Sequence, residues 1–200
     1  CFMSGSGTNA RRIIEHSLDQ DSNYMVGLIF TDVGDDRVDE KGEKVCKALD
    51  IATEYGIPYE CSDILDFYAA RGHRSKRDLA LRPEYDKTVL KKIEPHRIDV
   101  IVLAGYMSIL TDPILTRYYG RIVNVHPADL SIPGQGRRKY TGMHAVRDAI
   151  LAGENELFST THLVREKVDY GEILVRSKPV PVDLPEGLSL EQLKQDKALL

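Results

Sequence analysis

The sequence has little cysteine and no long apolar run. Its three cysteines, Cys1, Cys46 and Cys61, form no CxxC pair, and an odd number without a signal peptide fits a reducing compartment. No apolar stretch approaches the roughly 20 residues that span a bilayer. We therefore expect a cytoplasmic protein with no disulfide framework and no membrane partner.

Concentrated basic charge is also missing. The formal net charge is −4, and Lys and Arg form no long run. This balance argues against a dedicated nucleic-acid binder, so small molecules are the expected partners of a monomer or homodimer. The 200 residues, 42% of them hydrophobic, predict a single domain over 1–200. Because Cys1-Phe2-Met3 already has the character of a strand end, we expect a few residues to precede it.

Short β-rich runs alternate with helical stretches along the chain. Apolar residues at helical spacing predict helices near 10–18, 45–52, 85–93, 142–152 and 189–200. Strands are predicted near 2–3, 24–30, 57–61, 99–104 and 124–126, whereas the polar segment 62–81 is expected to be irregular. This alternation predicts an α/β fold with a mostly parallel, twisted sheet and helices on both faces.

The last third of the chain departs from that alternation. The runs 158–164 and 172–180 are β-like and are separated by the short turn Asp169-Tyr170-Gly171, which predicts a C-terminal antiparallel hairpin added to the parallel sheet. Before this hairpin, residues 131–139 combine one Pro, two Gly and two Arg. That composition predicts a mobile loop.

A glycine turn follows the first strand. Ser4-Gly5-Ser6-Gly7-Thr8-Asn9 lies between a strand and a helix, where backbone N–H groups and the helix N-terminus favour an anion such as phosphate. The turn also satisfies the dinucleotide pattern Gly-x-Gly-x-x-Ala, with Asp32 as the ribose partner. A third interpretation is a plain tight turn in which Thr8 or Asn9 caps the helix. The turn alone leaves all three open.

Asn124-Val125-His126-Pro127 is the most informative polar group. Asn124 and His126 are two residues apart on a predicted strand, so their side chains leave the same side. Pro127 resists continuing as a central strand, which places the pair at a strand end, where α/β sheets bind ligands. The amide and the imidazole could then point at one reacting atom, although local turn hydrogen bonding could also use both.

Four motifs are spaced along the chain. They are Ser4-Gly5-x-Gly7-Thr8-Asn9, Ala104-Gly105-Tyr106-Met107-x-Ile109-Leu110, Asn124-Val125-His126-Pro127, and His162 followed seven residues later by Asp169. Because they occur in the order seen in glycinamide ribonucleotide formyltransferases, the chain resembles that family over nearly its whole length. The resemblance implies the formyltransferase fold.

The resemblance also implies a site. It places the catalytic trio on Asn124, His126 and Asp169. It assigns phosphate binding to Gly7, Thr8 and Asn9, and folate or formyl contacts to Arg82, Met107, Ser108, Ile109 and Leu110. The implied ligands are 10-formyltetrahydrofolate as co-substrate and a phosphorylated amine, with no metal.

The implied reaction suits these residue types. When a neutral amine attacks the formyl carbon, negative charge develops on the formyl oxygen and positive charge on the amine nitrogen. Asn124 can donate its amide N–H to that oxygen. A protonated His126 near Asp169 can donate to the same oxygen or to the leaving folate nitrogen, and Asp169 can take the amine proton directly or through water.

Three departures from the family pattern concern the substrate. About seven extra residues, 132–138, precede Lys139-Tyr140 in a position where loops tolerate insertion. Tyr170 replaces the usual first Gly after Asp169, which restricts positive φ. Ser108 stands where an Arg is frequent. These changes leave the trio intact and keep the identity of the amine open.

We therefore expect formyl transfer to the amine of glycinamide ribonucleotide, in purine synthesis. The alternatives are a formyltransferase acting on another amine, a formyltetrahydrofolate hydrolase, and a non-catalytic nucleotide- or pterin-binding module. An NAD-dependent dehydrogenase would leave Asn124 and His126 unexplained. Taken alone, Asp169 and His162 have the character of structural residues, and Arg82 that of a solvated helix charge.

Overall fold

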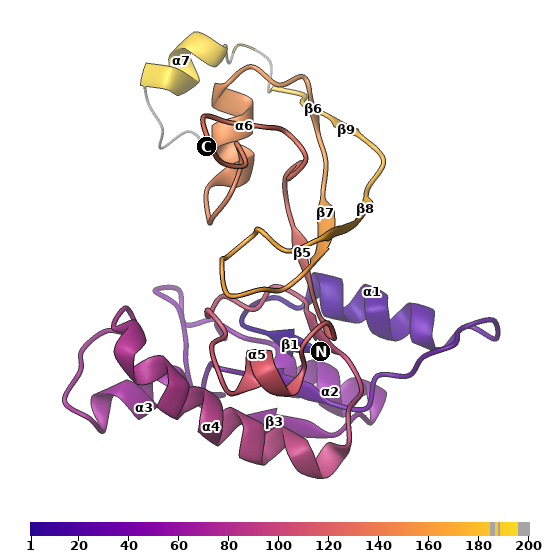
Figure 1. The fold of residues 1–200 in the computed structure, drawn as a ribbon, viewed down its shortest axis with the longest axis vertical. Coiled ribbons are helices and arrows are strands. Elements are labelled where there is room, and N and C mark those ends of the chain that lie inside the picture. Colours follow the sequence, from indigo (N-terminus) through magenta and orange to yellow (C-terminus); the bar gives the residue numbers. More distant parts are fainter. Residues whose placement is uncertain (185–186, 188, 196–200) are drawn as a thin grey trace. The chain divides into compact units, whose positions relative to one another are not determined.

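The computed structural model of the protein describes residues 1–184, 187 and 189–195 (Figure 1). These residues divide into two compact units, Cys1–Val123 and the chain from Asn124 onward. The expectation of one domain over 1–200 stays a prediction.

The first unit alternates strands and helices, as predicted. Its elements in chain order are β1 (Phe2–Met3), α1 (Thr8–Ser17), β2 (Ile29–Thr31), α2 (Ala48–Tyr55), β3 (Tyr59–Cys61), α3 (Ile64–Ala69), the 3₁₀ turn η1 (Leu79–Leu81), α4 (Arg82–Ile93), the 3₁₀ turn η2 (Glu94–His96), β4 (Ile101–Leu103) and α5 (Ile114–Arg117). β1 has the predicted bounds, and the other three strands are shorter than the β-rich runs that predicted them. Each helix that the apolar spacing predicted in this unit is present.

The strands of this unit pair in the order β3-β2-β1-β4, and all three pairs are parallel. Phe2 of β1 pairs with Phe30 of β2 and with Leu103 of β4. Successive side chains of a strand point to opposite faces of the sheet, so Phe2 and Met3 face different layers. The central strand therefore contributes to two cores.

One face of this sheet is covered by α1 and α2. Met3 packs in one apolar cluster with Ala10 and Ile14 of α1 and with Ile51 and Ala52 of α2. All five residues are at most 2% exposed. The stripe of small and branched residues on each helix is what allows both helices to approach the strands closely.

Aromatic rings fill the opposite face. The Phe2 ring centroid lies 4.6 Å from that of Phe30 and 5.4 Å from that of Tyr106. Tyr85 of α4 lies beside Tyr106 and makes an edge contact at 5.3 Å with Phe67 of α3. In the first unit, helices thus cover both faces of the sheet, which confirms the prediction.

The expectation that 62–81 is irregular was wrong, because this segment contains α3 and η1. Asp63 caps α3: its carboxylate accepts a hydrogen bond from the Asp66 N–H at 2.8 Å. Ile64 and Tyr68, four residues apart, bury one face of the helix. An Asx cap followed by two apolar residues at helical spacing was the available signal, and the surrounding charges obscured it.

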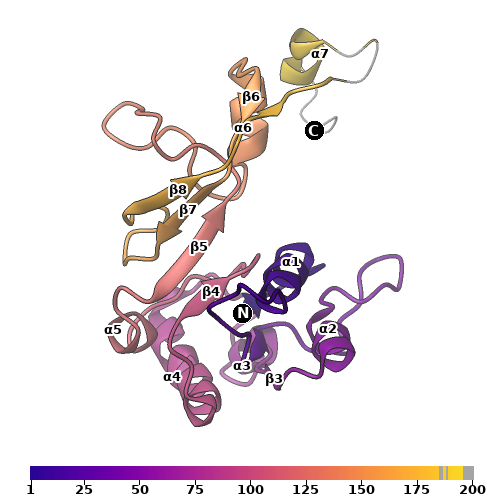
Figure 2. The ribbon, with the colours of Figure 1, turned by 90° about the vertical axis from the view of Figure 1, so that its right-hand side faces the viewer.

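The second unit is built around the end of β5 (Ile122–His126), a strand that begins in the first unit. It continues with α6 (Ala145–Leu151), β6 (Glu156–Leu157), β7 (Thr160–Leu163), β8 (Ile173–Arg176), β9 (Val180–Pro181) and α7 (Leu190–Gln195). The antiparallel pairing of β7 with β8 confirms the predicted hairpin, and Figure 2 shows the two strands side by side. The small sheet of β6 with β9 was not anticipated. The rest of the predicted final helix lies outside the described residues.

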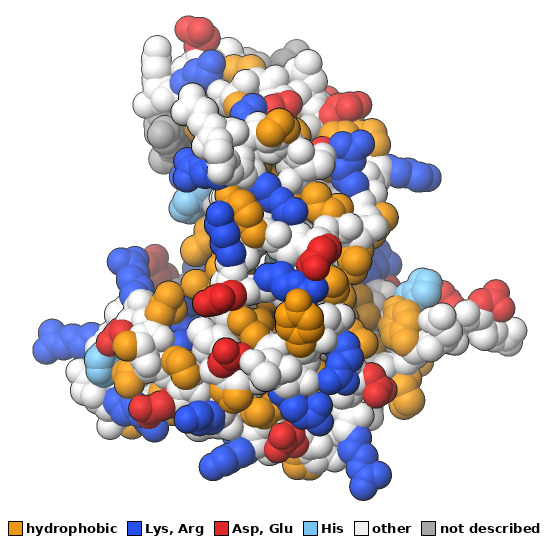
Figure 3. All heavy atoms as spheres, viewed as in Figure 1, with side chains coloured by type: hydrophobic (Ala, Val, Ile, Leu, Met, Phe, Trp, Pro, Cys, Tyr) orange, Lys and Arg blue, Asp and Glu red, His pale blue; other side chains and the backbone are white. Residues whose placement is uncertain are grey.

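Together the strands make a seven-stranded sheet in the order β3-β2-β1-β4-β5-β7-β8. This is the predicted α/β class, a mostly parallel sheet with an antiparallel pair at its C-terminal edge. No helix in the described part of the chain is long and apolar enough to cross a membrane. On the face shown in Figure 3, basic and acidic side chains are interspersed rather than gathered into one stripe.

Candidate active site

The end of β5 carries Asn124 and His126. Both residues project from the same side of the strand, because they are two positions apart. His126 is only 4% exposed, whereas Asn124 is half-buried. The predicted placement of this pair at a strand end is confirmed, since β5 stops at His126, immediately before Pro127.

Asp169 lies in the turn between β7 and β8 and faces inward. Its side chain is 7% exposed, and its Oδ2 accepts a hydrogen bond from the Gly142 N–H at 2.8 Å. Its backbone is left-handed, with φ 60°. That conformation costs most L-residues roughly 1–2 kcal/mol, and Asp is one of the residues that tolerate it. An ordinary solvent-exposed turn residue would need neither this burial nor this partner.

His126 is held between two acceptors. Its Nε2 lies 2.8 Å from the Tyr140 carbonyl oxygen, and its Nδ1 lies 3.6 Å from Asp169 Oδ1, an ion-pair distance. A carbonyl and a carboxylate can only accept hydrogen bonds. The ring can donate toward both neighbours only when both nitrogens carry a proton. Both ring nitrogens therefore face acceptors, which suits a role of His126 as a donor.

His162 joins the same cluster and orients Asn124. Its Nδ1 donates to the Leu163 carbonyl at 2.8 Å, and its Nε2 lies 3.1 Å from Asn124 Nδ2. Burial lowers the pKa of His162, so the neutral ring is favoured. In the tautomer with Nδ1–H, Nε2 accepts one of the two Asn124 amide N–H groups. This contact does not use the other amide N–H or the amide oxygen of Asn124.

Asp169 connects these groups within the second unit. Its Oδ1 is 3.6 Å from His126 Nδ1 and 3.7 Å from His162 Nε2. The structure thus brings Asn124, His126 and Asp169 together, and it adds His162, which by residue type had the character of a purely structural histidine. The sequence signal for His162 was its place seven residues before Asp169, and the structure buries it on β7 together with Thr160.

The glycine turn of the first unit ends in a helix without a side-chain cap. Gly7 is the N-cap of α1 with φ 74°, and no side chain accepts from the first turn. The interpretation that Thr8 or Asn9 caps the helix was wrong. The turn needs glycine at this position for its left-handed backbone angle, and a Cβ there would also displace the end of the Ile51 side chain. Thr8 and Asn9 are exposed beside the first amides of α1.

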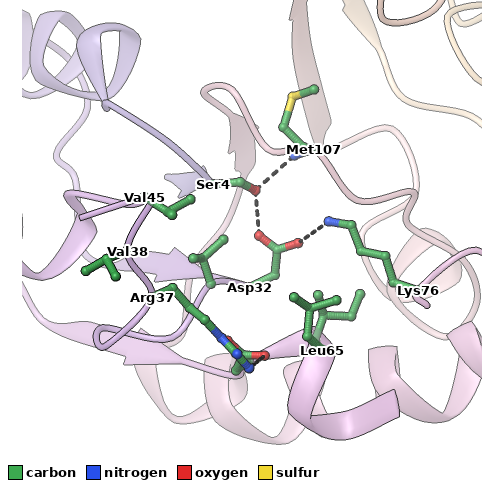
Figure 4. Close-up of a pocket in the computed structure, with 11 residues that line it drawn as sticks. Ser4, Asp32, Arg37, Val38, Val45, Leu65, Lys76 and Met107 are labelled. Carbon is green, nitrogen blue, oxygen red and sulfur yellow. Dashed lines mark hydrogen bonds and ion pairs between the residues drawn. The ribbon is translucent and has the colours of Figure 1, made fainter. Parts of the chain in front are cut away.

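Asp32 is committed to internal contacts, which removes support for a dinucleotide site. It is 1% exposed, and it accepts a hydrogen bond from Ser4 Oγ at 2.5 Å (Figure 4). It also accepts one from the Ser108 hydroxyl. Lys76 Nζ lies 3.7 Å from its Oδ2. Ser4 Oγ in turn accepts from the Met107 N–H at 2.9 Å. Instead of facing a ribose, Asp32 ties the residues after β1 to the 107–110 loop, at the edge of a pocket of about 350 Å³.

The 107–110 loop exposes alternate side chains. Met107 and Ile109 are 54% and 38% exposed, while Ser108 and Leu110 are buried. Arg82 is not the solvated helix charge that its type suggests, because it is only 2% exposed. Its guanidinium donates to the Ile109 carbonyl at 3.1 Å and to the Lys76 carbonyl at 2.8 Å. These contacts fit a residue that supports the loop, and direct contact of Arg82 with a ligand stays a prediction.

Asp86, one helical turn after Arg82, holds the residue that follows the loop. Its Oδ2 accepts from the Thr111 N–H at 2.6 Å and from the Thr111 hydroxyl at 2.7 Å, while its buried Oδ1 has no hydrogen-bond partner among the described residues. Burial raises the pKa of Asp86 to about 6 from 3.8. The buried carboxyl group therefore keeps its proton to a higher pH than a free aspartic acid does.

This shift predicts how stability depends on pH. Between about pH 4 and 6 the folded protein keeps a proton on Asp86 that the unfolded chain releases, so the free energy of unfolding should fall as the pH rises through this window and then level off. The shift corresponds to about 3 kcal/mol. As the pH rises from 4 to 8, the free energy of unfolding of Asp86→Asn should come to exceed that of the wild type by most of this difference. Urea unfolding measures both values. Asp21→Asn, on an exposed residue, should show no such trend.

Comparisons with known proteins show the family to which the chain belongs. The family model described as Formyl transferase matches residues 1–198. The phosphoribosylglycinamide formyltransferase of Escherichia coli is 36% identical over 181 residues, which cover 90% of this chain and 71% of that protein. The trifunctional purine biosynthetic protein adenosine-3 of Drosophila melanogaster is 32% identical over 185 residues. These residues cover 92% of this chain but only 12% of the insect protein.

A solved structure shows the same fold. The crystal structure of phosphoribosylglycinamide formyltransferase from Bacillus halodurans superposes with a TM-score of 0.69 at 30% sequence identity. The superposition covers 99% of this chain and 86% of that one. The architecture and the order of elements described above are therefore shared with a solved relative.

Proposed function

Because the chain belongs to the formyl transferase family, we propose that it transfers the formyl group of 10-formyltetrahydrofolate to the amine of glycinamide ribonucleotide, a step of purine biosynthesis. The observation that carries the proposal is the buried cluster of Asn124, His126 and Asp169, linked through His162. The similarity to phosphoribosylglycinamide formyltransferases supports this acceptor. We also propose that the protein acts in the cytoplasm, as a monomer or homodimer.

The second unit supplies the chemistry. The amine nitrogen attacks the formyl carbon, a C–N bond forms, and negative charge builds on the formyl oxygen. The Asn124 amide N–H that His162 leaves free donates to this oxygen. His126 donates from Nε2, which requires the formyl oxygen to take the place of the Tyr140 carbonyl. The oxygen thus receives two donors where its charge develops.

Collapse of the intermediate breaks the bond between the formyl carbon and the folate nitrogen. The proton lost by the amine goes to Asp169, directly or through water, and His126 supplies a proton to the departing folate nitrogen. The Gly142 N–H fixes Asp169 Oδ2, so Oδ1 is the oxygen left to work with His126. No nucleophilic side chain is needed, because the acceptor amine is itself the nucleophile.

The first unit supplies the binding groups. We assign the substrate phosphate to the turn of Gly7, Thr8 and Asn9, because the uncapped N-terminus of α1 offers backbone donors and a favourable dipole. The folate is assigned to Met107, Ser108, Ile109 and Leu110, with Arg82 behind the loop. Exposed Met107 and Ile109 provide apolar surface for a pterin ring.

The test supplies 10-formyltetrahydrofolate with glycinamide ribonucleotide, with other primary amines, or with water alone, and follows the loss of the formyl group. We expect rapid turnover only with glycinamide ribonucleotide. Turnover with water alone would identify a formyltetrahydrofolate hydrolase, and turnover with another amine would replace the acceptor. Binding of both compounds without turnover would identify a binding module. A His126→Ala preparation, made in parallel, measures contaminating activity from the expression host.

A further inference from the structure

The inserted segment 132–138 has internal structure. The Gly134 N–H donates to the Arg137 carbonyl at 2.6 Å, and the Lys139 N–H donates to the Ile132 carbonyl at 3.0 Å. Pro133 and Arg138 form an isolated antiparallel bridge. The segment is therefore a small hydrogen-bonded hairpin. Arg138 lies at its end, close to the residues that lead into Tyr140.

The residues before this hairpin are anchored as well. Asp129 is 5% exposed, and its Oδ1 accepts from the Ser131 N–H at 2.8 Å and from the Ser131 hydroxyl at 2.5 Å. Its Oδ2 pairs with Arg176 of β8 at 2.6 Å. Burial alone would raise the pKa of Asp129, and these hydrogen bonds with Ser131 and Arg176 hold it below its usual value. The hairpin thus starts from a fixed point rather than from a free loop.

Arg138 binds the backbone of the turn that carries Asp169. Its Nη1 donates to the Asp169 carbonyl at 2.6 Å and its Nη2 donates to the Gly171 carbonyl at 3.0 Å. The two carbonyls flank Tyr170, so the planar guanidinium spans the turn with two separate hydrogen bonds. A lysine would offer one nitrogen in place of the two separate nitrogens that the guanidinium places at these carbonyls.

Tyr170 completes the contact from the other side. Its hydroxyl oxygen accepts from the Arg138 backbone N–H at 3.2 Å, and the Arg138 guanidinium lies 5.6 Å from its ring centroid. Two departures from the family pattern, the inserted segment and the tyrosine after Asp169, therefore touch each other. Tyr170 itself does not adopt positive φ, because the left-handed residue of the turn is Asp169. The expected restriction on positive φ at position 170 does not arise.

We propose that Arg138 is a positioning residue, and that the inserted hairpin with Tyr170 serves as a strut that holds Asp169 toward His126. The inference rests on the proposed function for its kinetic part. Asp169 keeps a left-handed backbone and a buried carboxylate at once, and a turn so placed needs anchors on both sides. Gly142 fixes the carboxylate, and Arg138 fixes the backbone on either side of Tyr170.

The activity test compares Arg138→Ala with Arg137→Ala. Arg137 is the adjacent exposed arginine, and its side chain has no hydrogen bond or ion pair within the described part of the chain. We expect Arg138→Ala to lower kcat about 10- to 100-fold, because small misplacements of a reacting group have effects of this size, with KM for the phosphorylated amine little changed. Arg137→Ala should keep the wild-type kcat. Arg138→Lys should fall between the two, and ethylguanidinium in the buffer should restore part of the Arg138→Ala rate.

A double-mutant cycle tests the pairing with Tyr170. If the two residues act as one strut, Tyr170→Gly combined with Arg138→Ala should be no slower than the slower single variant. Effects that multiply, or a KM that rises while kcat is unchanged, would overturn the proposal.

A second measurement does not depend on turnover. The Gly142 amide donates to Asp169, so its hydrogen exchange reports whether the carboxylate stays in place. Exchange at Gly142 should be about tenfold faster or more in Arg138→Ala than in the wild type and in Arg137→Ala, at equal melting temperature. Unchanged exchange would reject the strut even if the wild type transfers formyl groups. Faster exchange in a protein without formyl transfer would reject the proposed function and leave the strut standing.

Discussion

Asp169→Asn should lower the kcat of formyl transfer by about 10²- to 10⁴-fold, the range expected when a proton-transfer group is removed. The change keeps the shape of the side chain, an oxygen that can accept from Gly142, and a residue type that tolerates the left-handed backbone. What it removes is the negative charge 3.6 Å from His126 Nδ1 and the group that takes the amine proton. The measurement is steady-state turnover of 10-formyltetrahydrofolate with saturating acceptor.

The matched control is Asp183→Asn, which removes the same charge from an exposed residue of the same unit. It should leave kcat unchanged. Asp169→Asn should also melt within a few degrees of the wild type, because its hydrogen bond to Gly142 is retained. A rate for Asp169→Asn equal to that of the control would show that Asp169 is only a turn residue.

Gly171→Ala should unfold or displace the turn that bears Asp169. A Cβ at position 171 would lie 1.7 Å from the Leu163 carbonyl oxygen and 2.7 Å from the Leu163 carbonyl carbon. Both are backbone atoms of β7, so neither can turn aside as a flexible side chain would. We expect a loss of roughly 3 kcal/mol or more in the free energy of unfolding, measured with urea, and a large fall in kcat.

Gly27→Ala is the control for this substitution. A Cβ at Gly27 meets no atom within 4 Å, and its φ is not left-handed. Replacement of such a glycine should change stability little or increase it slightly, because alanine has fewer unfolded conformations to lose. If Gly171→Ala proved as stable and as active as Gly27→Ala, the close approach of the β7–β8 turn to Leu163 would be wrong.

These residues show where the sequence was sufficient and where it was not. Helical spacing of apolar residues identified α1, α2 and α4, because burial of one face leaves a regular trace in the residue types. The end of β5 was identified from Asn124-x-His126-Pro127, and the β7–β8 hairpin from two β-like runs around a short turn. The helix α3 was missed because only Ile64 and Tyr68 of its exposed, charged segment are buried. The β6–β9 pair, of two residues each, is too short to leave such a trace.

The trio could be predicted because its members stand in ordered motifs, whereas their surroundings could not. The contact of Arg138 with the carbonyls of Asp169 and Gly171 joins residues about thirty positions apart through backbone atoms, which carry no residue-type signal. The same holds for the Tyr140 carbonyl that faces His126. For Asp32 the residue type suggested a ribose ligand, but the neighbours that occupy its oxygens, Ser4 and Ser108, are distant in sequence.

The Tyr140 carbonyl affects how strongly the site favours the transition state over the bound reactant. Exchanging this neutral oxygen for an equally neutral formyl oxygen gives His126 nothing, since one hydrogen bond to a neutral acceptor replaces another. Exchanging it for an oxyanion gives a stronger bond from the same donor, because the acceptor now carries a full negative charge. A main-chain atom can thereby cancel attraction for the ground state and leave the attraction for the charged intermediate, which is the difference on which rate acceleration depends.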